Sequence, residues 1–495
     1  MTDNTQATNN AKAGINKSLT DEIGTSRGNV TTPGSSIFNI NRDPFRSIRR
    51  GRQLFQRKFT RVQGQGANEG DGVGDLNTDI AIGAGLSDSC ALCHGRPRGS
   101  AGVGGNVVTR PDSRDAGHLF GLGLKEMLAD EITTDLRATR DLAIAKAQQS
   151  HHSVTMKVNS KGINYGSITA NSDGTLDTSM VAGVDTDLRV KPFFAEGSTI
   201  SIREFVVGAS HNEMGLEASA DPDLLTASAG GRVVTPSGMV LDGSKDKISP
   251  PPQPDWQNGN EIDPAIVDYL EFYLLNYFKP GHDIQNSTTD HGRSVFVKTG
   301  CAQCHIPDLT VNHDRRVADV ETVYDQVKGI FNSLFATATT LYQDINDGSG
   351  YPDLKLALGG SFVVKDIFTD FKRHDLGTSF YERNWDGSIQ TLFLTRALWG
   401  AGTTSPYGHD GRSITLNDAI LRHGGEAQAA HDAFVALKPN DSSALLTFLN
   451  SLVLFPPDDT ASTLDPGDPN QPNFPQFGHG SIKLTVLFND PADPE

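Results

Sequence analysis

The four cysteines of this 495-residue chain lie in two short motifs whose residues have a defined joint chemistry. The motifs are Cys90-Ala91-Leu92-Cys93-His94 and Cys301-Ala302-Gln303-Cys304-His305. Two cysteines three positions apart can each bond a vinyl group of one porphyrin, and the adjoining histidine can then ligate the iron. The sequence therefore predicts two covalently bound c-type haems, with His94 and His305 as iron ligands.

Three other interpretations of such cysteine pairs are weaker. A thioredoxin-like dithiol makes no use of the histidine that follows each pair. A zinc site with four cysteines requires the two pairs to meet in space and has no use for a histidine in both. A disulfide in an oxidising compartment remains open. The repetition of the whole motif, with no cysteine elsewhere, favours haem.

The composition of the chain limits the classes of partner that it could bind and bears on its cellular location. The formal net charge is −17, which disfavours nucleic acid and anionic membrane surfaces and leaves open an acidic face that docks a basic electron donor. No run approaches the roughly 20 apolar residues of a membrane span, and no secretory signal is visible at Met1. Because haem c is attached outside the bacterial cytoplasm, we nevertheless expect a periplasmic or secreted protein.

An internal repeat supports two haem domains. Gly51-Arg52-Gln53-Leu54-Phe55 precedes the first motif and Gly292-Arg293-Ser294-Val295-Phe296 precedes the second. Cys301 follows Phe296 by five residues, whereas 35 separate Phe55 from Cys90, so the Gly-rich stretch 64–85 is interpreted as an inserted loop. We predict a mainly α fold with two cytochrome c-like haem domains, long loops and small β excursions.

The domain boundaries follow from composition and from helix signals. Residues 1–40 are expected to be a disordered leader, 41–280 the N-terminal haem domain with insertions, 281–455 the C-terminal haem domain and 456–495 an extended tail. A helix should begin with Asp263 as N-cap and Pro264, and run to Phe278. Residues 150–186 suggest a hairpin, and 442–454 a helix with an apolar stripe.

Several C-terminal motifs resemble a known family. They are Thr395-Arg396-Ala397-Leu398-Trp399-Gly400, Pro406-Tyr407-Gly408-His409-Asp410-Gly411-Arg412 and His423-Gly424-Gly425-Glu426-Ala427, with Leu119-Phe120-Gly121-Leu122-Gly123-Leu124 nearer the N-terminus. Together they resemble the di-haem oxidoreductase family, which is related to bacterial di-haem cytochrome c peroxidases and, more distantly, to the rubber oxygenases. The resemblance covers most of residues 45–455.

The resemblance implies a second ligand for the second haem. In the peroxidases this ligand, commonly Met, lies fourteen residues beyond the histidine of the His-Asp-Gly element, and here that position is His423. A helix from about Leu416 would return His423 towards the iron. We expect His305 and His423 to ligate the second haem together, which suits electron transfer; the alternative is a surface histidine beside a glycine pair.

The resemblance also implies residues near the first haem. The run His211-Asn212-Glu213-Met214-Gly215 resembles a peroxidase element whose Glu manages peroxide protons, with a shortened approach. Glu213 is therefore the candidate acid/base, and the alternative is a Glu that only serves a helix terminus. His211 and His118 are further candidates on the distal side. Either could ligate iron in a resting state or bond a propionate.

Two further sites can be compared with those of the relatives: the first differs from them and the second resembles them. Relatives place a Trp between the haems, but the matching position here is Ala195, which puts electron relay by that residue in doubt. A calcium site between the domains would match Asp115, Thr404 and Pro406, whose oxygen ligands suit a hard cation. The alternative for Asp115 is a pair with a nearby Arg.

Three functions remain open at this point. The first is a peroxidase-like oxidoreductase in which the first haem reacts and the second transfers electrons. The second is an oxygenase of the rubber-cleaving type that uses dioxygen beside an apolar channel. The third is an electron-transfer cytochrome with both irons saturated, which needs His118 or His211 as a sixth ligand. The expected partners are a small oxidant (peroxide or dioxygen) and a redox partner protein.

Overall fold

The computed structural model describes residues 18–66, 87–95, 106–107, 114–252, 261–276, 281–283, 285–324, 334–384 and 387–454. Within these ranges the helices carry most of the architecture, as predicted, and the strands are short. The α-helices are α1 Leu19–Ile23, α2 Ser36–Arg42, α3 Pro44–Gln56, α4 Cys90–His94, α5 Leu122–Ser150, α6 Ile202–Met214, α7 Pro222–Ser228, α8 Pro264–Asn276, α9 Ser287–Lys298, α10 Leu416–Arg422, α11 Gln428–Val435 and α12 Pro439–Asn450. Short 3₁₀ helices are η1 Arg61–Gln63, η2 Cys301–Gln303, η3 Ala401–Thr403 and η4 Gly425–Ala427.

The strands pair into small antiparallel sheets. They are β1 Asn106–Val107, β2 Arg114–Asp115, β3 Val154–Ser160, β4 Ile163–Ala170, β5 Leu176–Asp177, β6 Arg232–Val234, β7 Val240–Asp242, β8 Gly281–His282, β9 Leu309–Val311, β10 Ala318–Tyr324, β11 Leu334–Thr340, β12 Tyr342–Ile345, β13 Leu354–Ala357, β14 Phe362–Val364, β15 Arg373–Asp375, β16 Glu382–Arg383, β17 Ile389–Gln390, β18 Leu392–Leu394 and β19 Leu452–Val453. Only β3, β4 and β5 form a three-stranded sheet among the described residues. The pairing of β8 with β19 joins the two ends of the predicted C-terminal unit.

The repeat seen in the sequence has a packing cause. Gly51 in α3 lies against α8, where a Cβ would come within 2.2 Å of the Tyr269 carbonyl oxygen. Gly292 in α9 lies against α12 in the same way, 2.0 Å from the carbonyl oxygen of Ala444. Glycine is therefore required at both positions because the helix backbones touch there.

The aromatic residue of each repeat packs one turn further along. The ring centroid of Phe55 lies 5.8 Å from that of Tyr273, and the centroid of Phe296 lies 5.7 Å from that of Phe448. Each partner ring stands four residues after the residue that its glycine touches. The two halves of the chain thus repeat the same helix pair, in which the first helix precedes the Cys-x-x-Cys-His motif and the second follows it.

The structure corrects the predicted leader. Residues 18–40 contain α1 and α2, so the prediction of disorder is wrong for this part, and residues 1–17 lie outside the described residues. The polar residues that suggested disorder have structural uses. Ser18 and Ser35 cap the two helices, and the Ser36 hydroxyl donates to buried Asp268 at 2.6 Å. The predicted tail 456–495 and most of the predicted loop 64–85 also lie outside the described residues.

The other predicted elements are present with adjusted ends. The Asp263 side chain accepts from the Ala265 N–H at 2.8 Å at the start of α8, and the predicted end at Phe278 lies outside the described residues. The last helix begins at Pro439 rather than Ser442, because proline suits the first helical position. It ends at Asn450, so Leu452 belongs to β19 and not to the helix as predicted.

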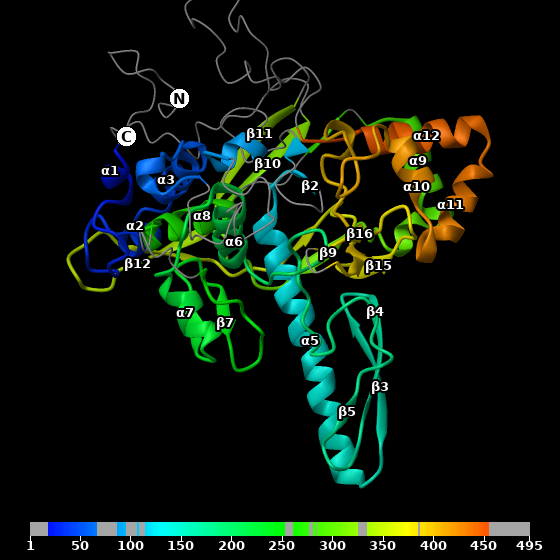
Figure 1. The fold of residues 1–495 in the computed structure, drawn as a ribbon, viewed down its shortest axis with the longest axis horizontal. Coiled ribbons are helices and arrows are strands. Elements are labelled where there is room, and N and C mark those ends of the chain that lie inside the picture. Colours follow the sequence, from blue (N-terminus) through cyan, green and yellow to red (C-terminus); the bar gives the residue numbers. More distant parts are fainter. Residues whose placement is uncertain are drawn as a thin grey trace, which may run out of the picture.

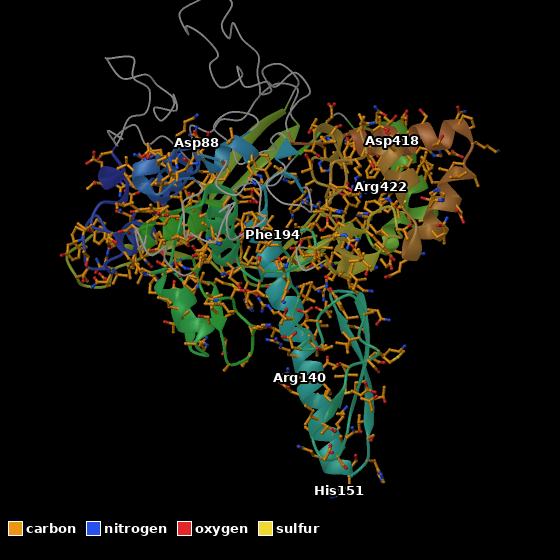
Figure 2. The ribbon with its side chains drawn as sticks, in the orientation of Figure 1. Asp88, Arg140, His151, Phe194, Asp418 and Arg422 are labelled. Atoms are coloured by element: carbon orange, nitrogen blue, oxygen red, sulfur yellow. The ribbon has the colours of Figure 1, made fainter. Side chains whose placement is uncertain are left out.

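Helix α5 connects both halves of the chain. Its first turns share a hydrophobic core with Leu309, Val311 and Trp399 of the C-terminal half. Its later turns project from the body and carry the predicted hairpin β3–β5 (Figure 1). Figure 2 shows Arg140 on this arm and His151 at its far end. No helix among the described residues combines the length and apolar character needed to cross a membrane.

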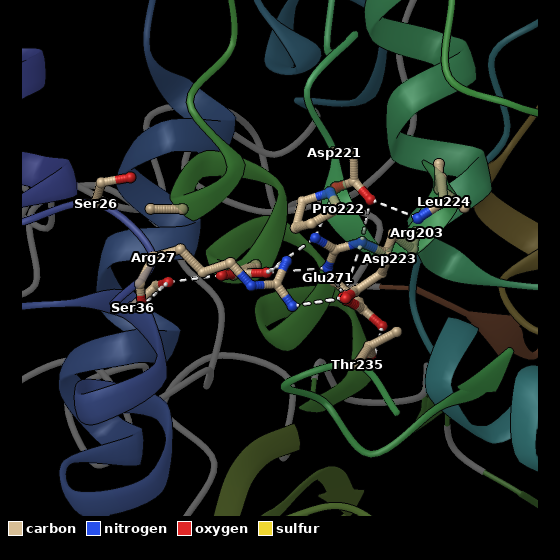
Figure 3. Close-up of polar contacts among 12 residues, drawn as sticks. Ser26, Arg27, Ser36, Arg203, Asp221, Pro222, Asp223, Leu224, Thr235 and Glu271 are labelled. Carbon is tan, nitrogen blue, oxygen red and sulfur yellow. Dashed lines mark hydrogen bonds and ion pairs between the residues drawn. The ribbon is translucent and has the colours of Figure 1, made fainter. Parts of the chain in front are cut away.

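A buried charge network fixes α6, the helix that also carries Glu213 (Figure 3). Arg203 is fully buried, and its guanidinium contacts Asp221 at 2.6 Å, Glu271 at 2.8 Å and Asp268 at 3.0 Å. Arg27 adds a second cation 3.3 Å from Asp268. The network ties α6 to α8, to the start of α7 and to the N-terminal segment.

Candidate functional site

The two Cys-x-x-Cys-His motifs lie in separate parts of the molecule. Figure 2 shows Asp88, two residues before Cys90, and Arg422, next to His423, on opposite sides of the body. None of the four cysteines is in a disulfide, so the disulfide interpretation is not supported. The motifs do not meet in space as a shared zinc site would require.

The first motif forms helix α4. The ring of His94 contacts the Gly117 carbonyl oxygen through Nδ1 at 2.7 Å. A carbonyl can only accept, so Nδ1 carries the proton and Nε2 keeps its lone pair. Burial lowers the pKa of His94 to about 4, which keeps the ring neutral. This is the arrangement of a metal-ligating histidine whose orientation is set by a backbone carbonyl.

A pocket of about 50 Å³ lies beside the first motif. Its walls include both cysteines, His94 and Glu213, with Phe205 and Leu274 among the apolar residues. The donor set fits haem c, but this volume is far smaller than a porphyrin, so haem binding requires the apolar walls to move apart.

Helix α6 brings Glu213 to this pocket. The Glu213 carbonyl accepts the Ser87 N–H at 3.1 Å, which fixes the end of the helix against the segment before Cys90. Burial and the nearby Glu213 carboxylate raise the pKa of Cys93 to about 11. Because the Glu213 carboxylate interacts electrostatically with Cys93, it lies close to the position at which the first haem would be attached.

The other two distal candidates do not line the first pocket. His211 turns aside, and its Nδ1 contacts Glu217 at 2.7 Å. His118 contacts the Trp399 carbonyl oxygen through Nε2 at 2.7 Å, while its buried Nδ1 has no hydrogen-bond partner. Burial lowers the pKa of His118 to about 3, so the ring is neutral and Nε2 is the donor. The usual ligand nitrogen of His118 is therefore already engaged.

A much larger cavity, of about 440 Å³, lies beside the second motif. Cys301, Cys304, His305 and His423 all line it. His305 contacts the Phe368 carbonyl oxygen through Nδ1 at 3.0 Å, as His94 does with its own carbonyl. Burial lowers the pKa of His305 to about 4. The size and donor set of this cavity fit a covalently attached haem.

His423 stands at the end of α10 on the same cavity. Its Nδ1 contacts the Ala419 carbonyl oxygen at 2.7 Å, which leaves Nε2 unprotonated. Burial lowers its pKa as well. Both His305 and His423 thus offer a neutral Nε2 lone pair to one cavity.

The His-Asp-Gly element, which contains His409, fixes the position of His423. The Asp410 carboxylate contacts the Arg422 guanidinium at 2.5 Å, next to His423 in the chain. His409 stacks on Phe393 with ring centroids 4.1 Å apart, and its Nε2 lies 2.9 Å from Glu382. The element therefore holds the end of α10 in place through the contact of Asp410 with Arg422.

Three predicted calcium residues line the large cavity together: Asp115, Thr404 and Pro406. The Oδ1 atom of Asp115 is buried without a hydrogen-bond partner. Burial raises the pKa of Asp115 to about 6, against the opposing effect of Arg396. An acceptor left unsatisfied in this way is suited to a cation.

Ala195, which stands where relatives have a Trp between the haems, lies between the two pockets. Ala195 lines the large cavity, while the neighbouring Phe194 packs on Phe205 with centroids 5.2 Å apart, and Phe205 lines the small pocket. The side chain at the position where relatives have Trp is therefore a methyl group.

Two cationic side chains line the large cavity that were not predicted from the sequence. Lys125 of α5 and Arg396 both line it. Burial, with Arg396 nearby, lowers the pKa of Lys125 to about 7. These side chains suit the carboxylates of a porphyrin. Arg396 belongs to a motif that carried the family resemblance, but nothing in the spacing marked Lys125.

A cluster of possible metal ligands around Cys304 is not arranged to bind a metal ion. Its sulfur lies with Asp370 and His374 in a group whose donor atoms are all within 4.8 Å of one another. His374 contacts Asp370 through Nε2 at 3.0 Å and Glu426 through Nδ1 at 2.8 Å. Burial opposes its protonation, but the bonds to Asp370 and Cys304 raise the pKa of His374 to about 10. A protonated imidazole has no lone pair for a metal.

Residues 361–452 match the model of a protein family described as "Di-haem oxidoreductase, putative peroxidase". This confirms the resemblance predicted from the C-terminal motifs, which lie inside the matched range. No curated protein sequence matches the chain.

Two solved structures share a low similarity with this one. A hydrazine synthase of Kuenenia stuttgartiensis is 13% identical, with a TM-score of 0.31, over 86% of this chain and 94% of that chain. A MauG-like protein associated with microbial copper homeostasis is 13% identical, with a TM-score of 0.25, over 66% of this chain and 88% of that chain. Scores this low carry no argument about function.

Proposed function

We propose that this chain is a di-haem c-type oxidoreductase of the peroxidase type, in which His94 and His305 would bind the irons of two covalently attached haems. The observation that carries the proposal is shared by both motifs. Each histidine donates Nδ1–H to a backbone carbonyl, at 2.7 Å for His94 and 3.0 Å for His305, and keeps Nε2 as a ligand atom. The family match over residues 361–452 supports the class of di-haem oxidoreductase, although both motifs lie outside the matched range.

The two haems have different tasks in this proposal. His423 gives the second iron a second imidazole, so that site exchanges electrons without binding an oxidant. At the first site, His118 and His211 are held by Trp399 and Glu217, away from the pocket lining. The first iron then keeps a position for a small oxidant, which favours an enzyme over an electron carrier.

Glu213 moves the proton in this scheme. When bound, the first haem supplies an iron that accepts the oxygen of a peroxide. The Glu213 carboxylate takes the proton from the near oxygen and returns it to the far oxygen, which favours loss of water. The apolar walls of the pocket, Phe205 and Leu274 among them, limit the access of bulk water to the reacting oxygens.

Rapid mixing of the protein with hydrogen peroxide or with dioxygen tests this function. We expect the ferric protein to show a high-spin component and to react with peroxide. Reaction of the reduced protein with dioxygen and an apolar polyene, without reaction with peroxide, would instead assign an oxygenase. Two fully low-spin haems inert to both oxidants would assign an electron carrier.

The variant His423→Ala tests the second iron site. We expect one of the two haems to change from low spin to high spin, because the iron loses one of two imidazoles, while the other haem is unchanged. Absorption and electron paramagnetic resonance spectra measure this. His431→Ala is the matched control, since His431 lines the same cavity but bonds Asp432 at 2.9 Å. An unaltered spectrum in His423→Ala would place the ligand elsewhere.

The variant Asp115→Asn tests whether calcium binds at the predicted site. We propose that Asp115, with Thr404 and Pro406, binds Ca²⁺ beside the large cavity, and that the amide variant binds it more weakly because one ligand charge is lost. Calorimetric titration of the chelator-treated protein with CaCl₂ measures the affinity. A parent protein that takes up no calcium rules the site out.

Covalent haem attachment also implies export, so we propose a periplasmic or secreted location. The net charge of −17 suits a basic protein as the electron donor.

A further inference from the structure

One buried histidine stands on a continuous connection between the two motifs. The connection starts at His94, whose Nδ1–H donates to the Gly117 carbonyl at 2.7 Å. Gly117 is bonded to His118 in the chain, and the His118 ring donates Nε2–H to the Trp399 carbonyl at 2.7 Å. Two hydrogen bonds and one stretch of covalent chain thus lead from the first iron ligand to Trp399.

The same connection continues to the second motif. Leu398, next to Trp399, donates its N–H to the Ile367 carbonyl at 3.2 Å. Ile367 is bonded to Phe368, whose carbonyl accepts from Nδ1 of His305 at 3.0 Å. Four hydrogen bonds and the chain between them therefore join Nδ1 of one predicted iron ligand to Nδ1 of the other.

The connection is buried along its middle. Trp399 is 3% exposed, Phe368 1% and Ile367 0%, and Nδ1 of His118 is shielded from solvent. The Trp399 ring is held against Gly121, where a Cβ would lie 2.4 Å from it. Hydrogen bonds among buried groups are stronger than those on the surface because the local dielectric is low. Gly117, His118 and Trp399 also line the large cavity beside the second motif.

His118 is the sole side chain in the connection besides the two ligand histidines; every other group is backbone. Its tautomer is fixed, because a ring protonated on Nδ1 instead would direct a lone pair at the lone pairs of the Trp399 oxygen. The sequence suggested His118 as an iron ligand, but this bond gives it another role.

We propose that an electron passes from the second haem to the first along this bonded connection, and that His118 is the side chain that links its two halves. The inference rests on the proposed function, since it needs haem at both motifs. In the step, the second iron goes from Fe(II) to Fe(III) and the first iron gains that electron, while His118 keeps its proton. A one-electron donor protein or a chemical reductant restores the second iron. The methyl side chain of Ala195 cannot be oxidised, so it offers no relay of its own.

Three variants of the two-haem protein test the role of His118. His118→Leu and His118→Met both fill the site without an N–H, so either suffices if the other does not fold. His118→Gln keeps a donor for the Trp399 carbonyl. The matched histidine control is His152→Leu, at an exposed position on the arm. The measurement is electron transfer between the haems after flash photolysis of carbon monoxide from the half-reduced protein, with each haem followed by its own absorption band.

We expect His118→Leu to slow this transfer, because it removes the hydrogen bond that joins the segment holding His94 to Trp399. The loss of a hydrogen-bonded group behind a metal ligand usually costs about 10–100-fold in activity, and we expect a decrease of that order here. His118→Gln should recover most of the rate, and His152→Leu should match the parent. A parent-like rate in His118→Leu with both haems attached would overturn the inference. So would a slow rate in Trp399→Phe, which keeps the carbonyl, together with a normal rate in His118→Leu, since the indole would then carry the electron. A parent protein with fewer than two haems is a separate result, read from the haem content, and it refutes the proposed function itself.

Discussion

Glu213→Gln is expected to lower the rate of reaction with hydrogen peroxide by about 10²–10⁴-fold, the typical contribution of a positioned acid/base. The amide keeps the size and hydrogen-bonding capacity of the side chain but cannot exchange a proton at neutral pH. Binding of cyanide to the first iron should be unchanged, because His94 and the pocket walls are intact. Stopped-flow mixing of the ferric protein with peroxide measures the rate.

His211→Asn is the companion variant, because the sequence offered both residues as catalytic. His211 bonds Glu217 and is absent from the lining of the small pocket, so its replacement should change the rate far less. If His211→Asn loses the reaction and Glu213→Gln keeps it, the proton transfer belongs to His211. The carboxylate would then have only a structural role.

Arg203→Met should lower the free energy of unfolding by about 3–5 kcal/mol, because removing one partner leaves buried charges uncompensated. Asp221, Asp268 and Glu271 each lose a contact of 3.0 Å or less. Denaturant unfolding with unchanged m-value measures the loss. Arg140→Ala is the control, since Arg140 pairs only with its exposed neighbour Asp141 and such pairs contribute at most about 1 kcal/mol.

The pH dependence of this variant has a definite sign. Burial raises the pKa of Glu271 to about 7 even with Arg203 present, and removal of the guanidinium raises it further. A carboxyl whose pKa is higher in the folded state than in the unfolded state stabilises the fold below its unfolded pKa. That contribution is lost as the pH rises through the folded pKa. Parent and variant lose this contribution equally up to about pH 7, where Glu271 of the parent ionises, so the deficit of Arg203→Met should grow as the pH rises above neutral. A deficit that stays constant from mildly acidic to mildly alkaline pH would contradict this explanation.

Residue type and spacing were sufficient to predict part of this structure. The Cys-x-x-Cys-His motifs and the repeated glycine and phenylalanine around Gly51 and Gly292 are local patterns with a direct chemical or steric cause. The helices that pack against these glycines come from distant parts of the chain and were not predicted. His423, which lines the same cavity as His305, was predicted from the resemblance to the peroxidases, in which a ligand follows the His-Asp-Gly element by fourteen residues.

Features that depend on distant partners could not be predicted. The bond of His118 to Trp399 joins residues 281 positions apart, and that of Arg203 to Asp268 joins residues 65 apart. The order of residues 18–40 depends on contacts such as Ser36 with Asp268, so composition alone suggested disorder. His211 illustrates the same limit, since its neighbour Glu217 decides where the ring points.

The number of haems that stay attached to the denatured chain tests the central claim most directly. A pyridine haemochrome assay, with the intact mass of the protein produced in a host that matures c-type cytochromes, measures it. We predict two covalent haems per chain, one lost in a Cys90→Ser/Cys93→Ser variant and the other in Cys301→Ser/Cys304→Ser. A parent chain that carries fewer than two haems, or releases them on denaturation, would contradict the account.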